Sequence, residues 1–573
     1  MTYSGENILT LRPSALRIPS GTSRRVTPGL VILVSTLLAL GVRVFTLTRP
    51  GFLTQSTEYD DGVYLGAAIR MSQGIVPYRD FAFVQPPGIL LLMAPVTLLS
   101  RSVSTVAGLG LARVLTVAAS TACVPLAGRL VRHRGTLVTA LTCGFLAIYP
   151  PDIATAHTLL LEPWMNLLCL IGANLAFREG KLTGRARHLA YAGAMIGFAG
   201  AVKYWAIAPA AVLLAVCLAD RGQRWRRSAA YLGGVCGGFV ITVAPFFLIA
   251  PATFFRSTII YQAARVGSGT PLTLRLAHVT GLIDILNYAG HVTILAGGSS
   301  LFADSAASDT APANPRLLPV VVALALAGVI AAGYLRCRSQ LEWFAFGTAA
   351  LALTAILCYS AFFYHYPAFP GPWLAIVIGV SFGQLIAALP RRVLGLPCRG
   401  VPVTLLALVL VTAAAVQLCD VAQIKLPTGV QAITKKIPPG ACVLTDEASL
   451  TIAADRFYAW QPGCPVVIDS LATTLVFTHG ISVQAGADSN TRAVADWQKI
   501  LMRARYVWLS PNQWRRLPWP AYAREWFHLH FWQKVPFRHG VVPGYGQLYE
   551  RRTRKSVQAI LNENPGLAAL TQP

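Results

Sequence analysis

The stretch Pro28–Leu47, PGLVILVSTLLALGVRVFTL, decides the fold class of this chain. As a helix, an apolar run of this length crosses roughly 30 Å of hydrocarbon. Similar runs recur as far as Cys419. We expect membrane spans near 28–47, 106–130, 135–150, 162–178, 189–204, 205–220, 229–249, 317–335, 341–361, 367–389 and 401–419. The sequence therefore predicts an all-α polytopic membrane protein with about eleven transmembrane helices and short interfacial helices.

The composition agrees with a membrane protein. Of the 573 residues, 54% are hydrophobic and 12% are charged, and the mean hydropathy is +0.55. Soluble domains average roughly 25% charged residues. The formal net charge of +25 is concentrated in short loops between the apolar runs. This distribution is typical of cytoplasmic loops under the positive-inside rule, so we expect no nucleic-acid partner.

The basic loops also predict the domain organisation. They alternate consistently if residues 1–27 are a cytoplasmic N-terminal segment and the stretch Pro86–Ser100 is a short interfacial or re-entrant helix. The transmembrane domain is then 28–419, with external loops 48–105 and 250–316. Residues 420–554 are polar, with short strand-like runs at 441–445, 465–469 and 506–509, which predicts a small extracytoplasmic α/β domain. We expect 555–573 to be a disordered tail.

The cysteines carry one further expectation. Most of the eleven stand singly inside apolar runs, as small buried residues do. Cys442 and Cys464 lie in the polar C-terminal part instead. They are candidates for a disulfide if that part is extracytoplasmic.

Acidic residues gather in the first two external loops. The first loop contains Glu58, Asp60, Asp61 and Asp80, and the second contains Asp152, His157 and Glu162. A charge at a membrane face is costly and points to function, so we expect Asp60 and Glu162 to line one outer cavity. The alternative for Asp60, Asp61 and Glu162 is capping of the helices that follow them.

Cations and rings fall at the same predicted depth. Lys203 stands in the apolar sequence Gly200-Ala201-Val202-Lys203-Tyr204-Trp205, and Arg265 lies in the second long external loop. Tyr364-His365-Tyr366 ends another predicted span. These residues suit an anionic headgroup. The alternatives are a snorkelling lysine, loop arginines that meet lipid phosphates and an interfacial aromatic belt.

Five segments, taken in order, resemble the GT-C glycosyltransferases of the protein-mannosyltransferase (glycosyltransferase family 39) and aminoarabinose-transferase type. They are Asp60-Asp61-Gly62-Val63-Tyr64, Pro77-Tyr78-Arg79-Asp80-Phe81, Gln85-Pro86-Pro87, Leu161-Glu162-Pro163 and Val202-Lys203-Tyr204. The resemblance covers roughly 50–390 and implies that Asp60 is a catalytic base, that Glu162 lines the site and that Lys203 contacts a lipid-linked phosphate. The family usually has Asp-Glu at 60–61 and often His at the position of Gln85.

The expected function is inverting transfer of a monosaccharide from a polyprenyl-phosphate donor to an extracytoplasmic cell-envelope glycan or glycolipid. We expect Asp60, Asp61 and Glu162 to be catalytic, because the attacking hydroxyl must lose a proton. Cations must offset the charge of the departing phosphate. The expected donor-phosphate residues are Lys203, Arg265, His365 and Tyr366, and the expected substrate-lining residues are Asp80 and Gln85.

Several further expectations accompany this function. The reaction requires no metal, although clustered carboxylates are compatible with a divalent ion. The Ala- and Arg-rich, Lys-poor composition is typical of a high-GC actinobacterium, which favours cell-envelope mannan or arabinan as the acceptor. The expected sugar is mannose. The alternatives are an arabinofuranosyltransferase of the same fold, a lipid or solute transporter or flippase, and a non-catalytic envelope scaffold. A transporter is expected to show paired broken helices in matching halves and charges near mid-bilayer, whereas these charges lie at one face.

Overall fold

The structure of the chain is a computed structural model. It describes residues 27–220, 222–263, 269–282, 318–334, 339–390, 400–423, 426, 430–457, 463–534 and 545–570. The predicted cytoplasmic segment before Thr27, much of the predicted loop 250–316 and Arg265 lie outside the described residues.

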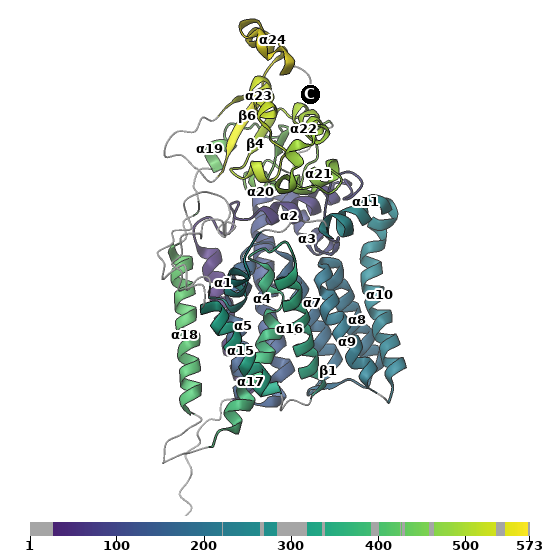
Figure 1. Cartoon of the computed structure of the whole chain (residues 1–573), viewed down its shortest axis with the longest axis vertical. Helices are drawn as coiled ribbons and strands as arrows, with labels where there is room; N and C mark the ends of the chain where they lie inside the picture. Colours follow the sequence, from purple (N-terminus) through teal and green to yellow (C-terminus); the bar gives the residue numbers. More distant parts are fainter. Residues whose placement is uncertain are drawn as a thin grey trace, which may run out of the picture.

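Each predicted span coincides with an apolar helix of the bundle in Figure 1. These helices are α1 (Pro28–Thr48), α4 (Thr105–Val131), α5 (Thr136–Ile148), α7 (Leu161–Ala176), α8 (Ala186–Val202), α9 (Ile207–Ala219), α10 (Arg224–Ile249), α15 (Leu318–Tyr334), α16 (Gln340–Cys358), α17 (Gly371–Ala388) and α18 (Gly400–Gln423). Within the described residues, five helices are individually long and apolar enough to cross a membrane. Helix α5 with the bent α6 (Pro150–Ala156) makes a sixth. The chain is a multi-pass membrane protein, and the count of eleven spans stays a prediction.

Small residues bring α8 and α10 into close contact. A Cβ atom on Gly193 of α8 would lie 2.2 Å from the carbonyl oxygen of Tyr231, and one on Gly234 of α10 would lie 2.0 Å from that of Ala190. In a bilayer such close backbone packing replaces the hydrophobic force that joins helices in water. This packing against α10 therefore holds α8 in place, including its C-terminal end, which Lys203 follows.

A layer of shorter helices covers one end of the bundle. Helices α2 (Tyr59–Ser72) and α3 (Gly88–Ser102) lie between the long helices and the C-terminal part (Figure 1). The predicted interfacial helix at 86–100 is α3. Residues 61–70 of α2 are all buried. A helix with so little exposed surface is fixed on every side by protein, which suits a segment that carries reactive groups.

The C-terminal part contains a four-stranded mixed sheet. Its order is β3 (Val443–Thr445), β4 (Tyr506–Leu509), β6 (Gln547–Arg551) and β5 (Phe531–Gln533). Strand β3 runs parallel to β4, and the other neighbours are antiparallel. The helices of this part include α19 (Val430–Thr434), α20 (Ala448–Ala453), α21 (Ser470–Phe477), α22 (Thr491–Arg503) and α23 (Ala521–His530). Cys442 and Cys464 form a disulfide, as predicted. The placement of this part outside the cell stays a prediction.

Two sequence expectations for this region are corrected. The strand-like run 465–469 is not a named strand, and only a bridge between Asp469 and Glu447 remains. The predicted disordered tail contains helix α24 (Arg554–Glu563), whose first turn is capped by a hydrogen bond from the Ser556 amide to the Thr553 hydroxyl at 3.3 Å. Apolar residues at helical spacing, Val557, Ile560 and Leu561, were the overlooked signal.

Candidate active site

The first turn of α2 presents two acidic side chains with different surroundings. Glu58 is the N-cap residue, and its Oε1 accepts a hydrogen bond from the Tyr59 amide at 2.9 Å. Asp60 is half-buried, and its Oδ2 accepts a hydrogen bond from the Tyr64 hydroxyl at 3.2 Å. Carboxylates are favoured at a helix N-terminus, where backbone N–H groups lack partners. Capping and chemistry are therefore compatible at this turn.

Asp61 differs from its neighbour Asp60 because it is fully enclosed. Its Oδ2 lies 2.5 Å from Nη2 of Arg113, and neither side chain is exposed. Its Oδ1 accepts a hydrogen bond from the Leu159 amide at 2.5 Å. This buried pair joins α2 to α4 and to the loop before α7. The geometry of Asp61 suits support of the site, because its carboxylate faces protein on both oxygens.

Glu162, Lys203 and His365 meet in a second cluster, the cation cluster. Glu162 stands in the first turn of α7, Lys203 fills the break between α8 and α9, and His365 precedes the 3-10 turn Tyr366–Ala368. Oε1 of Glu162 forms an ion pair with Nζ of Lys203 and lies 2.9 Å from Nδ1 of His365. The sequence prediction that these three residues share one site is thus consistent with the structure.

Aromatic rings complete the cation cluster. Nζ of Lys203 lies 4.5 Å from the ring centroid of Trp205 and 4.7 Å from that of Tyr366. Cation–π contacts of this kind hold an ammonium group in a partly dry site. In the described part of the chain, Oε2 of Glu162 has no hydrogen-bond partner. A buried carboxylate oxygen without a donor is unfavourable, so this atom is available to a further polar group.

Tyr364 connects the first turn of α2 with the cation cluster. Its hydroxyl donates a hydrogen bond to Oε2 of Glu58 at 2.7 Å, while the next residue, His365, contacts Glu162. Burial, together with the nearby Asp60 carboxylate, raises the pKa of Glu58 to about 8. No role was predicted for Glu58 from the sequence. The available signal was its position as the residue immediately before a helix that begins with Tyr59.

The two predicted substrate-lining residues are placed differently. Asp80 is exposed, 2.8 Å from Nη2 of Arg79, and accepts a hydrogen bond from the Val76 amide. These contacts tie it to its own turn rather than to the cation cluster. Gln85 is half-buried, and its main-chain carbonyl oxygen accepts a hydrogen bond from the Tyr78 hydroxyl at 2.5 Å. The segment after Gln85 reaches α8, because a Cβ on Gly88 would lie 2.6 Å from the Ala201 backbone.

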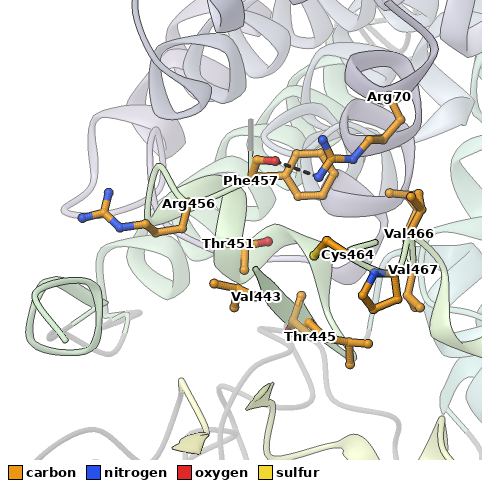
Figure 2. A pocket seen from close by; sticks show the side chains of 12 residues that line it. Arg70, Val443, Thr445, Thr451, Arg456, Phe457, Cys464, Val466 and Val467 are labelled. Atoms are coloured by element: carbon orange, nitrogen blue, oxygen red, sulfur yellow. Dashed lines mark hydrogen bonds between the residues drawn. The ribbon is translucent and has the colours of Figure 1, made fainter. Parts of the chain in front are cut away.

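A pocket lies near the other end of α2, where Arg70 meets the C-terminal part (Figure 2). Nη2 of Arg70 donates a hydrogen bond to the Phe457 carbonyl at 2.9 Å, and its guanidinium lies 4.4 Å from the Phe457 ring centroid. Other lining residues are Thr445, Thr451, Arg456, Cys464 and Val467. None of the described residues that line this pocket is acidic. The pocket therefore does not provide the base that the expected chemistry needs.

The described residues contain no group of three or more His, Cys, Asp or Glu side chains that is arranged to hold a metal ion. The carboxylates of the site instead face phenols, an ammonium, an imidazole and a guanidinium, as described above.

Solved structures show what this fold resembles. The chain superposes on ArnT from Cupriavidus metallidurans bound to undecaprenyl phosphate, with a TM-score of 0.53 and 14% identity over 92% of this chain and 98% of that chain. It also matches the Archaeoglobus fulgidus oligosaccharyltransferase in the apo form, with a TM-score of 0.54 and 12% identity over 86% of this chain and 70% of that chain. A further match is the archaeal oligosaccharyltransferase AglB in complex with an inhibitory peptide and a dolichol-phosphate (TM-score 0.50, 12% identity, 85% and 69% covered).

These neighbours are glycosyltransferases with the GT-C fold. The chain therefore has the GT-C fold that its sequence motifs predict. No protein-family model matches the sequence, and no curated protein matches it closely.

Proposed function

We propose that this chain is an inverting glycosyltransferase of the membrane that moves a monosaccharide from a polyprenyl-phosphate donor to a cell-envelope glycan or glycolipid. The observation that carries the proposal is the connection between the α2 turn that bears the half-buried acid Asp60 and the cation cluster. Adjacent residues Tyr364 and His365 contact Glu58 and Glu162 respectively, which brings the two parts together. An acid and a cation are the two groups that this transfer requires.

Asp60 is the general base of the proposed reaction. Its carboxylate takes the proton of the acceptor hydroxyl as the hydroxyl oxygen forms a bond to C1 of the sugar. The bond between C1 and the phosphate oxygen breaks, and the polyprenyl phosphate leaves with the electron pair. Attack on the face opposite the leaving group inverts the configuration at C1. The reaction needs no resident cofactor, and a divalent metal remains compatible with it.

Lys203 and His365 receive the donor phosphate in this proposal. Lys203 is paired with Glu162 in the structure, and Nζ has further donors to offer a phosphate oxygen. Glu162 orients the Lys203 ammonium and the His365 ring through one oxygen atom. The ring face of Tyr366 contacts the ammonium group of Lys203. Asp61 positions α2 through Arg113, and Gln85 begins the segment that packs on α8. Arg265, an expected phosphate partner, lies outside the described residues.

Mannose is the proposed sugar, and arabinofuranose is the second candidate. ArnT was solved with undecaprenyl phosphate and AglB with a dolichol-phosphate. These lipids support a polyprenyl-phosphate donor and leave the sugar open. The flippase alternative is disfavoured by the position of Glu58, Glu162 and Lys203, which stand at or beside helix ends of the bundle.

The decisive experiment supplies membranes with radiolabelled polyprenyl-phosphate mannose or arabinose, each with candidate acceptors. We expect mannose label to move to the acceptor with inversion at C1. Label that moves only from the arabinose donor would replace the sugar but keep the reaction. Lipid that crosses the membrane without any sugar transfer would contradict the proposal and favour a flippase.

The proposed location is the plasma membrane, with the N-terminus cytoplasmic and the C-terminal part outside. The disulfide between Cys442 and Cys464 supports an oxidising compartment for this part. Reporter fusions after residue 420 test the placement. Reporter activity on the cytoplasmic side would contradict it and change the number of spans by one.

A further inference from the structure

Polar contacts connect the start of α2 with the C-terminal part. The Ser56 hydroxyl donates a hydrogen bond to Oε1 of Glu447 at 3.2 Å and lies 2.7 Å from the Ser449 hydroxyl. A Cβ on Gly62 would lie 2.1 Å from the Ser449 amide nitrogen. The two backbones therefore touch directly, two residues beyond Asp60. None of these contacts has a part in the proposed chemistry.

Tyr59 forms the second connection. Its hydroxyl donates a hydrogen bond to Oδ1 of Asp469 at 2.8 Å and accepts one from the Leu471 amide at 3.3 Å. The guanidinium carbon of Arg516 lies 4.1 Å from the Tyr59 ring centroid. Because its hydroxyl is hydrogen-bonded and its ring face is covered by Arg516, the Tyr59 side chain has little freedom to rotate. Tyr59 lies between the cap residue Glu58 and Asp60, so its position fixes both neighbours.

Arg516 is the common element of these contacts. Its Nη1 lies 2.8 Å from Oε2 of Glu447 and 3.2 Å from Oδ2 of Asp446. The Arg516 side chain is 14% exposed, and the two carboxylates are 1% exposed or less. Buried charges are tolerated when they are paired and hydrogen-bonded, so this arrangement is geometrically demanding. The residue that orients Glu447 toward Ser56 also covers the ring of Tyr59.

We propose that Arg516 is a positioning residue for the active site: through Glu447 and Ser56 on one side and the Tyr59 ring on the other, it fixes the turn that carries Glu58 and Asp60. The C-terminal part is then a structural component of the catalytic site. Its effect on turnover rests on the proposed function, whereas its effect on the α2 turn does not. A displacement of about 1 Å at a reacting group can reduce turnover roughly 10²-fold.

The test uses the full-length protein in nanodiscs and three variants, Arg516→Met, Tyr59→Phe and Ser56→Ala. Arg516→Met leaves the carboxylates of Asp446 and Glu447 without their cation. If this variant does not fold, the milder variants Tyr59→Phe and Ser56→Ala provide the test. Arg515→Met is the matched control, because Arg515 packs 4.7 Å from the ring centroid of Trp514 within the C-terminal part. Hydrogen exchange of residues 59–66, kcat, donor KM and the pH profile of kcat are measured for each.

We expect faster amide exchange in 59–66 for Ser56→Ala, Tyr59→Phe and folded Arg516→Met. The expected kcat is roughly 10- to 100-fold lower than that of the wild type. Donor KM is expected to remain unchanged, because the cation cluster lies on other helices. The pH profile is expected to shift, because the acids change surroundings. Wild-type exchange in 59–66 for folded Arg516→Met would overturn the proposal. If Arg516→Met does not fold, wild-type exchange in Ser56→Ala would overturn it. An equal effect of Arg515→Met would also overturn it. Altered exchange in a chain that transfers no sugar would leave the positioning role intact and refute the proposed function alone.

Discussion

The first turns of α2 and α7 both present acidic residues, but their partners differ. Glu162 of α7 contacts two basic side chains, Lys203 and His365. Glu58 and Asp60 of α2 contact phenols, from Tyr364 and Tyr64. A carboxylate beside an ammonium group is stabilised as the anion. Burial and the neighbouring Asp60 carboxylate instead raise the pKa of Glu58 to about 8. Acidic residues therefore suit the binding of cations in the first turn of α7 and the acceptance of a proton in the first turn of α2.

The same distinction separates Asp60 from Asp61. Asp61 is locked against Arg113 and the Leu159 amide, while Asp60 is half-buried. Sequence adjacency therefore says little about shared function in a helix, because neighbouring side chains point about 100° apart. Substitutions that remove one contact at a time test this contrast.

The largest effect is expected for Asp60→Asn. The amide keeps the size of the side chain and cannot accept the proton, and loss of a general base costs about 10²–10⁴ in rate. Asp496→Asn is the matched control, because Asp496 is an acid of the C-terminal part that pairs with Lys499 at 3.2 Å. The measurement is kcat at equal amounts of folded protein. Wild-type turnover in Asp60→Asn would remove Asp60 from the mechanism.

A smaller effect is expected for Lys203→Ala. A charge-assisted contact to phosphate contributes roughly 1.5–3 kcal/mol, which corresponds to about a 10- to 150-fold rise in donor KM. Lys203→Arg is expected to retain part of the affinity, since it keeps the charge on a planar group. Lys499→Ala, a change at an exposed lysine paired with Asp496, serves as the control. Unchanged donor kinetics in Lys203→Ala would reduce Lys203 to a membrane anchor.

The smallest effect concerns Glu58 and pH. Its pKa of about 8 in the fold exceeds the ordinary value of 4.5, so between these pH values the folded chain binds more protons than the unfolded chain. This contribution to stability is fully present below about pH 4.5, declines as pH rises toward 8, and is level above that. Thermal midpoints between pH 5 and 8.5 are expected to fall more steeply for wild type than for Glu58→Gln. Parallel curves would show that Glu58 titrates normally.

The sequence predicted the helices of the bundle well because the bilayer imposes both their length and their apolar character. The break at Lys203 was also predictable, since a lysine between apolar runs favours a helix end. The sequence placed Asp60, Glu162, Lys203 and His365 at one face, and the structure brings the last three into contact.

Pairings between distant residues were not predictable from this sequence. Arg113 stands 52 residues after Asp61 inside an apolar helix, and nothing local marks it as the partner of that acid. Tyr59 and Asp469 are 410 residues apart. Their contact depends on how the C-terminal part packs on α2. Local patterns carry no information about such packing, which explains why Asp61 was expected to be catalytic and Arg516 was overlooked.

The most direct test measures donor binding and turnover together for Asp60→Asn and Lys203→Ala. Purified protein is mixed with labelled polyprenyl-phosphate mannose, and the bound fraction is recorded before acceptor is added. We predict that Asp60→Asn binds donor as wild type does and transfers almost none of it, whereas Lys203→Ala binds donor weakly. Equal loss of binding in both variants, or normal transfer by Asp60→Asn, would contradict the division of roles between α2 and the cation cluster.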